Sequence, residues 1–141
     1  MARRETYLDH LSSVPLFSAC SRRDLGKIAK AGDELEVEAG HELVTQGDAG
    51  RECFVVVEGT ATVKRGNRKV ASLGPGDCIG ELALLDHGPR TASVVADGKM
   101  TLFVIGARQF AGVIEDVPSL SRKVMAALAS RVRELDSKIY G

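Results

Sequence analysis

The chain has 141 residues, a length that predicts one domain covering residues 1–141. Lys and Arg together number 19, and so do Asp and Glu, so the formal net charge is zero. This balance disfavours a protein whose main task is to bind DNA or an acidic membrane surface. No stretch approaches the roughly 20 consecutive apolar residues of a membrane-spanning helix.

Three cysteines, Cys20, Cys53 and Cys78, are widely spaced and form no C-x-x-C pair. This pattern favours neither a zinc site nor a disulfide framework. We expect three reduced, largely buried thiols in a cytoplasmic protein. Behind Arg3-Arg4 there is no apolar run of the kind that a secretory signal peptide contains.

Residues 1–32 are predicted to form helices. Ser21 and Asp24 have the spacing of a capping box, Leu25 and Ile28 then share a face, and Gly32 is placed to end this helix. We expect an earlier short helix over residues 5–12, and Leu16 and Phe17 to pack on the core.

Residues 33–105 are predicted to form short strands separated by turns rich in Gly, Asp and Pro. Short strands at this spacing are typical of a sandwich or barrel. With helices at both ends, the prediction is a mainly β fold: a jelly-roll-type antiparallel β-roll flanked by N-terminal and C-terminal α-helices. The expected strands are residues 34–38, 43–45, 54–57, 60–63, 70–73, 93–96 and 101–105.

Residues 106–141 are predicted to be helical again, with Phe110, Val113 and Ile114 on one face. A longer helix is expected to begin near Pro118, since proline is tolerated in a first helical turn. Apolar residues then follow one stripe, for which core packing is favoured over docking of a partner. The stripe consists of Leu120, Val124, Leu128, Val132, Leu135 and Ile139.

The segment over residues 80–93 combines features that suit a compact anion. It reads Gly80-Glu81-Leu82-Ala83-Leu84-Leu85-Asp86-His87-Gly88-Pro89-Arg90-Thr91-Ala92-Ser93. The start of a short helical turn offers backbone N–H groups, and Arg90 offers a planar fork for two oxygens. Glu81 offers a carboxylate acceptor for a hydroxyl. A ligand with a phosphate beside a sugar hydroxyl would satisfy all three.

This segment resembles the phosphate-binding cassette of cyclic nucleotide-binding domains, a family that includes catabolite activators, protein kinase A regulatory subunits and cyclic nucleotide-gated channels. The resemblance covers residues 10–139. Residues 80–84 and 89–93 are its most specific parts, and the turn glycines Gly47, Gly59 and Gly74-Pro75-Gly76 also match. It implies a β-roll over residues 33–105 with the cassette at 80–93, and a C-terminal lid over residues 106–141.

The resemblance implies a role for each matching residue. Arg90 pairs with the exocyclic phosphate oxygens, Glu81 accepts a hydrogen bond from the ribose 2′-hydroxyl, and Gly80 lets the backbone approach the sugar. The N–H groups of Leu82, Ala83 and Ala92 point at the phosphate and ribose. Val63, Val70 and Leu73 line the base pocket, and Leu135 lies near the base.

Thr91 belongs to the site but does not decide the base, because a small residue that bonds its own backbone fits this position as well. By resemblance the protein is a non-catalytic regulatory sensor with no metal and no cofactor. Its ligand is cyclic AMP or, less favoured, cyclic GMP. It acts on an effector protein or a fused domain, as a monomer or homodimer, without direct DNA binding or a membrane span.

Two other functions stay open at this stage. An enzyme of cupin type or a phosphodiesterase is disfavoured, because His10, His41 and His87 are too dispersed for a metal centre. His87 lies inside the cassette, which allows a small effect of pH on binding. A degenerate, non-binding interaction module is disfavoured because Glu81 and Arg90 are both present.

Overall fold

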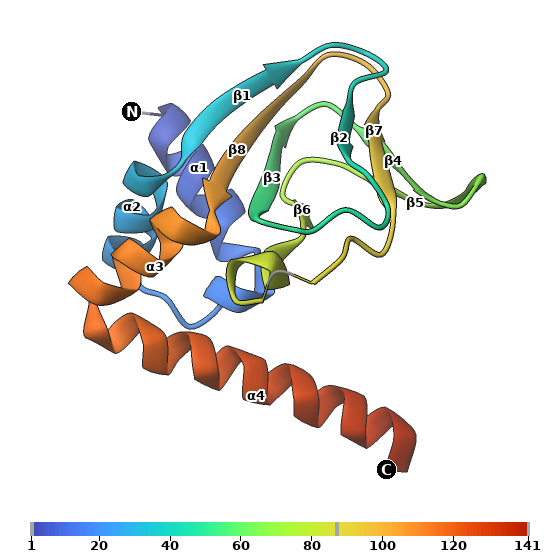
Figure 1. Cartoon of the computed structure of the whole chain (residues 1–141). Coiled ribbons are helices and arrows are strands. Elements are labelled where there is room, and N and C mark those ends of the chain that lie inside the picture. Colours follow the sequence, from blue (N-terminus) through green and yellow to red (C-terminus); the bar gives the residue numbers. More distant parts are fainter. Residues whose placement is uncertain (1, 87, 141) are drawn as a thin grey trace.

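The computed structural model describes residues 2–86 and 88–140. A β-roll packs against a group of helices drawn from both ends of the chain (Figure 1). In chain order the elements are α1 (Ala2–Ser12), η1 (Pro15–Phe17), α2 (Arg22–Ala31), β1 (Asp33–Val37), β2 (Glu42–Val44), β3 (Glu52–Glu58), β4 (Ala61–Arg65), β5 (Arg68–Leu73), β6 (Cys78–Ile79), η2 (Glu81–Leu84), β7 (Ser93–Ala96), β8 (Met100–Gly106), α3 (Ala107–Asp116) and α4 (Pro118–Tyr140).

The strands form two antiparallel four-stranded sheets, ordered β1-β8-β3-β6 and β2-β7-β4-β5. The predicted antiparallel β-roll with helices at both ends is therefore confirmed. The two-residue strand β6 was not predicted, because its residues lie between the Gly74–Asp77 turn and Gly80 and show no alternation. Leu35 of the edge strand β1 is 38% exposed, so of the two apolar residues in this strand only Val37 is buried.

Strand β3 explains how the core is divided. Its central residues are all buried, since one face of the strand points into the roll and the other toward the helices. Phe54 and Val56 pack inside the roll with Val94 and Leu102. Cys53 and Val55 instead join the cluster under the helices, as do Phe103 and Ile105 of β8.

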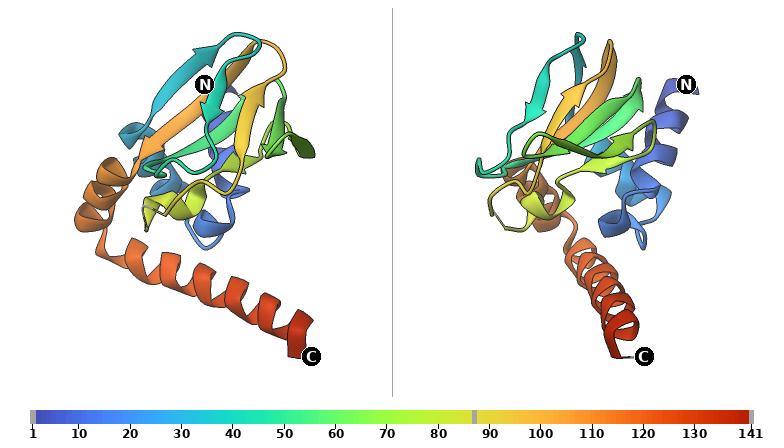
Figure 2. Two further views of the ribbon diagram at one scale, coloured as in Figure 1. Left: turned by 45° about the vertical axis from the view of Figure 1, so that its right-hand side comes forward. Right: turned by 90° about the vertical axis from the view of Figure 1, so that its right-hand side faces the viewer.

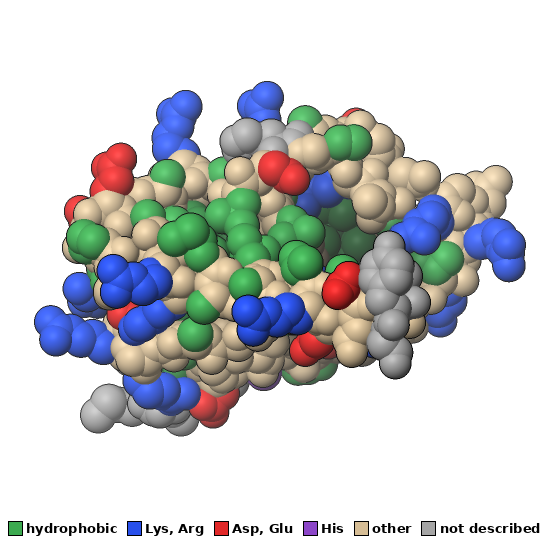
Figure 3. Space-filling model, turned by 90° about the horizontal axis from the view of Figure 1, so that it is seen from below, with side chains coloured by type: hydrophobic (Ala, Val, Ile, Leu, Met, Phe, Trp, Pro, Cys, Tyr) green, Lys and Arg blue, Asp and Glu red, His purple; other side chains and the backbone are tan. Residues whose placement is uncertain are grey.

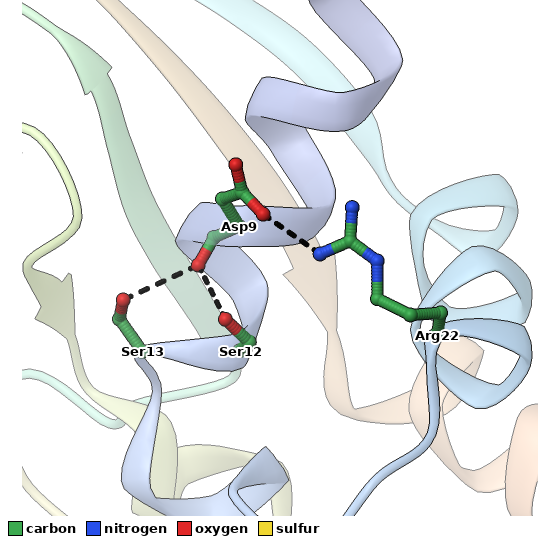
Figure 4. Close-up of polar contacts among 4 residues, drawn as sticks. All are labelled: Asp9, Ser12, Ser13 and Arg22. Atoms are coloured by element: carbon green, nitrogen blue, oxygen red, sulfur yellow. Dashed lines mark hydrogen bonds and ion pairs between the residues drawn. The ribbon is translucent and has the colours of Figure 1, made fainter.

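The N-terminal helices have side-chain hydrogen bonds and an ion pair at their ends. Ser21 and Asp24 form the predicted capping box, which begins α2, and the helix ends before Gly32. At the end of α1, the Asp9 carboxylate pairs with Arg22 at 2.7 Å (Figure 4). The Asp9 carbonyl accepts from the Ser12 and Ser13 hydroxyls at 2.6 and 3.2 Å.

The C-terminal helix α4 contacts the body from its start to Arg131, and its apolar contacts lie in the first half. Leu120, Val124 and Ala127 are buried, and Lys123 pairs with the buried Asp24 of α2. Val132 and Leu135 are 64% and 60% exposed, and the helix extends away from the roll (Figure 2). The stripe prediction is therefore correct for its first half and wrong for Val132 and Leu135, while the side chain of Ile139 lies outside the described part.

Within residues 2–86 and 88–140, no helix has the length and apolar character needed to cross a membrane.

Candidate ligand-binding site

A cavity of about 490 Å³ lies between η2, the returning segment 88–92 and the roll. This volume falls within the range of small-molecule sites. Seen from below, the molecule has a hollow lined by hydrophobic side chains (Figure 3). Nine of the predicted site residues line the cavity: Val63, Leu73, Gly80, Glu81, Leu82, Ala83, Arg90, Thr91 and Ala92.

Gly80 precedes η2 and adopts a left-handed conformation, with φ of 71° and ψ of 37°. A side chain there would be strained by the backbone, and its Cβ would overlap Nη1 of Arg90. Only glycine therefore lets the Arg90 guanidinium lie against the start of η2. The Ala83 N–H is donated to the Gly80 carbonyl at 3.0 Å, so this predicted phosphate contact is engaged within the turn.

The Arg90 guanidinium is held on one side by the backbone. Its Nη2 donates to the Glu52 carbonyl at 2.8 Å. Among the described residues, its Nη1 is the buried side-chain polar atom that has no hydrogen-bond partner. Burial lowers the pKa of Arg90, while Glu52 and Cys53 act in the opposite direction, and an arginine remains a cation at neutral pH.

The loop before β3 fixes the backbone around Arg90. The Gly47 N–H donates to the Arg90 carbonyl at 2.9 Å, and the Arg90 N–H donates to the Asp48 carbonyl at 2.7 Å. The Gly50 N–H donates to the Gly88 carbonyl at 3.0 Å. A Cβ on Gly50 would lie 3.2 Å from Cζ of Arg90, so this glycine leaves room for the guanidinium.

Glu81 lies at the start of η2 and is 8% exposed. Its Oε2 accepts from the Leu16 N–H at 3.0 Å, which connects η2 to the N-terminal η1. Its Oε1 pairs with Nη1 of Arg131, a residue of α4 that also lines the cavity. The structure thus brings Glu81 and Arg90 to one cavity but gives the Glu81 carboxylate partners within the chain.

The remaining cavity wall includes the carboxylate residue Asp86 and a group of apolar side chains. Val63 and Leu73, from neighbouring strands β4 and β5, are joined by Val44, Ile79 and Val94. The structure does not place Val70 or Leu135 in this wall. Val70 is 49% exposed on the edge strand β5, and Leu135 is 60% exposed on the outer half of α4. The family resemblance implied both residues, but the match of sequence positions did not show which side of the strand or helix each side chain occupies.

Sequence analysis missed Arg131, Gly50 and the Glu52 carbonyl. Arg131 is one of several basic residues on α4, and only the packing of that helix places it beside Glu81. Gly50 lies three residues after the turn glycine Gly47, but its contact with Arg90 joins segments far apart in the sequence. A backbone carbonyl leaves no signal in the side-chain pattern.

The surroundings of the cavity also bear on the predictions for the cysteines, for a metal site and for His87. Cys78 lines the cavity, and burial raises its pKa to about 12, with Glu81 acting in the same direction. Among residues 2–86 and 88–140, no group of three or more His, Cys, Asp or Glu side chains is placed to hold a metal ion. His87, with its expected effect of pH, lies outside the described residues.

Comparison with known proteins identifies the class that this fold and this cavity define. The family model for the cyclic nucleotide-binding domain matches residues 34–117. The chain belongs to the cyclic nucleotide-binding domain family, whose members are regulatory and generally non-catalytic. The resemblance seen in the cassette is thereby confirmed.

Individual relatives agree with this assignment. The chain is 33% identical over 136 residues to a cAMP-dependent protein kinase regulatory subunit from Neurospora crassa, covering 95% of this chain and 35% of that protein. It therefore spans about a third of that relative's length.

Solved structures give the same fold. The N-terminal domain of a Streptomyces coelicolor transcriptional regulator is 29% identical, with a TM-score of 0.87 over 92% of this chain and 96% of that one. The Thermus thermophilus catabolite activator protein is 29% identical, with a TM-score of 0.70 over 89% and 61%.

Proposed function

We propose that this domain is a sensor that binds cyclic AMP, with cyclic GMP as the second candidate ligand, and carries out no reaction on it. The observation that carries the proposal is that Arg90 lines the cavity and that its buried Nη1 has no hydrogen-bond partner among the described residues. An unsatisfied buried donor costs about 1–3 kcal/mol, more when charged. A cyclic phosphate bound there would supply an anionic acceptor and offset this cost.

The rest of the cassette is proposed to hold the phosphate and the ribose. Gly80 gives Arg90 access to the cavity, and the N–H groups of Leu82 and Ala92 are proposed donors to the ligand. Glu81 is proposed to accept a hydrogen bond from the ribose 2′-hydroxyl. Of the cassette residues, Ala83 fits its proposed role least well, because its N–H is donated to Gly80.

The base is proposed to occupy the apolar wall formed by Val63 and Leu73. Thr91 is exposed and its carbonyl accepts from Nε of Arg65 at 3.2 Å, so it gives no preference between adenine and guanine. Support for cyclic AMP comes from the relatives named as cAMP-dependent protein kinase regulatory subunits.

Binding is proposed to move the C-terminal helices. The cassette and α4 meet at the Glu81–Arg131 pair, so a ligand at Glu81 acts on the helix directly. Such a ligand shifts the helix only if it binds one arrangement better than the other. In this proposal α4 moves toward the cavity, since only then can Leu135 reach the base.

We propose that residues 1–141 act as one domain in the cytoplasm, as a monomer or homodimer, on an effector protein or a fused domain. We also propose that the domain itself does not contact DNA and needs no metal or cofactor. The formal net charge of zero supports the first of these exclusions.

A thermal unfolding scan of the wild-type protein with cyclic AMP, cyclic GMP or linear AMP tests the proposal. A ligand at 100 times its Kd adds about 2.7 kcal/mol of stability, which raises the midpoint by several degrees at about 2–8 °C per kcal/mol. We expect the largest shift with cyclic AMP and little with AMP. No shift with either cyclic nucleotide would favour a non-binding module, and conversion of cyclic AMP to AMP would reveal an enzyme.

A further inference from the structure

The cavity contains a second arginine that differs from Arg90 in its contacts. Arg131 reaches the cavity from α4, the C-terminal helix, and its Nη1 pairs with Oε1 of Glu81. The Arg131 side chain is 39% exposed, whereas that of Glu81 is 10% exposed. Arg131 is therefore the more exposed partner of the pair, and both residues line the cavity that a ligand would enter.

The opposite side of Glu81 is closed. Oε2 accepts from the Leu16 N–H at 3.0 Å, and Leu16 is fully buried and is not part of the cavity wall. Each carboxylate oxygen thus has a donor within the chain. A ligand hydroxyl that donates to Glu81 from the cavity has to displace Arg131 or share the carboxylate with it.

The two polar ends of the cavity are therefore prepared differently. At Arg90 a buried N–H lacks a partner among the described residues, while at Glu81 the acceptor is already paired. We propose that Arg131 is a specificity-determining residue that competes with the ligand's hydroxyl for Glu81 and so reduces how much that hydroxyl contributes to affinity. This inference rests on the proposed binding of a cyclic nucleotide.

The same contact marks the limit of the attached part of α4. Among the described residues, Arg131 is the most C-terminal one with a side-chain hydrogen bond or ion pair. Val132 and Leu135 beyond it are exposed. Displacement of Arg131 therefore breaks the contact between α4 and Glu81 and leaves the helix free to change its position, so a ligand's hydroxyl and the helix compete for one carboxylate.

The test compares two ligands on three proteins. Dissociation constants for cyclic AMP and 2′-deoxy cyclic AMP are measured by calorimetry on wild type, Arg131→Gln and Arg133→Gln. Arg133 is exposed on the same helix, so its variant repeats the charge change without touching Glu81. Thermal midpoints without ligand establish that all three are folded.

In Arg131→Gln we expect cyclic AMP to bind roughly three- to fivefold tighter, because a partly exposed ion pair no longer has to be broken. The deoxy ligand, which does not need Glu81, is expected to bind wild type and Arg131→Gln equally. The dissociation constant of 2′-deoxy cyclic AMP divided by that of cyclic AMP then increases in Arg131→Gln. In Arg133→Gln this ratio stays at the wild-type value. A general loosening of the fold would change both ligands together and leave the ratio unaltered.

Two results would overturn the inference and are distinguishable from each other. Weaker cyclic AMP binding by Arg131→Gln would show that Arg131 contacts the ligand, and an unchanged ratio would show that it takes no part in binding. In both cases the binding function itself would remain intact. Absence of binding by all three folded proteins would instead remove the proposed function, and the role of Arg131 with it.

Discussion

Gly80 is required at its position because a side chain there would overlap the guanidinium of Arg90. The left-handed backbone of Gly80 turns the chain into η2, and the missing side chain leaves the space that Nη1 of Arg90 occupies. The guanidinium is then fixed by the Glu52 carbonyl on one side, and on the other side Nη1 has no hydrogen-bond partner among residues 2–86 and 88–140. The proposed binding of a phosphate in the cavity thus depends on both residues.

Replacing Gly80 by Ala tests this dependence. We expect cyclic AMP binding to weaken by at least about tenfold, since left-handed strain of about 1–2 kcal/mol and displacement of Arg90 act together. Gly74→Ala is the control, because its Cβ would meet nothing within 4 Å. Calorimetric titration of both variants gives the comparison, and equal affinities would contradict the close approach of Arg90 to Gly80.

The thiols give a second prediction at this scale. Burial raises the pKa of Cys20 to about 11 and that of Cys78 to about 12, and it raises the pKa of Cys53 well above the usual value. At pH 8 about one part in a thousand or less of Cys20 and Cys78 is then thiolate, the reactive form. Ellman's reagent should react slowly with the native protein and promptly with all three thiols in guanidinium chloride. Rapid native modification of Cys78, identified by mass spectrometry, would contradict the burial of the cavity wall.

At the scale of elements, α4 combines a packed half and an exposed half. Leu120 and Val124 pack under the helices, the Lys123–Asp24 pair fixes the helix to α2, and the outer turns carry exposed Val132 and Leu135. A helix built this way is anchored at one end and can move at the other, which is the property that the proposed coupling requires.

The same substitution at two positions of α4 measures this division. Leu120→Ala should lower the free energy of unfolding by about 2–5 kcal/mol, because it opens a cavity in the core. Leu135→Ala should stay within about 0.5 kcal/mol of wild type, as exposed positions usually do. Urea unfolding of both variants decides, and a comparable loss in Leu135→Ala would mean that the outer half is buried in solution.

The Asp24–Lys123 pair makes the anchor sensitive to acid. The hydrogen bond from Lys123 lowers the pKa of Asp24 below its usual 3.8, and the Ser21 bonds act in the same direction. Unfolded Asp24 therefore takes up its proton at a higher pH than folded Asp24. The contribution of the charged Asp24 to the free energy of unfolding is complete at a pH above the usual pKa of 3.8 and is lost from about pH 4 downward.

Asp24→Asn removes this contribution. We expect the free energy of unfolding of the variant to be about 1 kcal/mol lower than that of wild type at pH 7. An ion pair with a partly exposed partner, here Lys123, contributes little more than this to stability. The difference should shrink as the pH falls below 4, while Asp116→Asn, at an exposed position, serves as the control. Urea unfolding from pH 7 to pH 3 gives the comparison. A difference that does not depend on pH would contradict the charged pair.

For the whole molecule, the pattern of strands, turns and helix caps was enough to predict the β-roll, because these signals are local. Each signal predicts the element in which it lies: the Ser21–Asp24 capping box predicts a helix start, the glycines predict turns, and the buried apolar runs predict β3 and β8. The pairing of Glu81 with Arg131 could not be predicted, since it depends on where α4 docks. The exposure of Val70 and Leu135 likewise depends on which strand forms the edge and where the helix leaves the body.

The role of Arg90 is tested most directly by equilibrium binding of cyclic AMP to Arg90→Ala, with Arg68→Ala as the matched control on exposed strand β5. Loss of the charged partner of a buried phosphate costs about 2–5 kcal/mol, so affinity should drop by at least about thirtyfold in Arg90→Ala and remain at the wild-type value in Arg68→Ala. If folded Arg90→Ala binds cyclic AMP as tightly as Arg68→Ala, the phosphate is not held at Arg90.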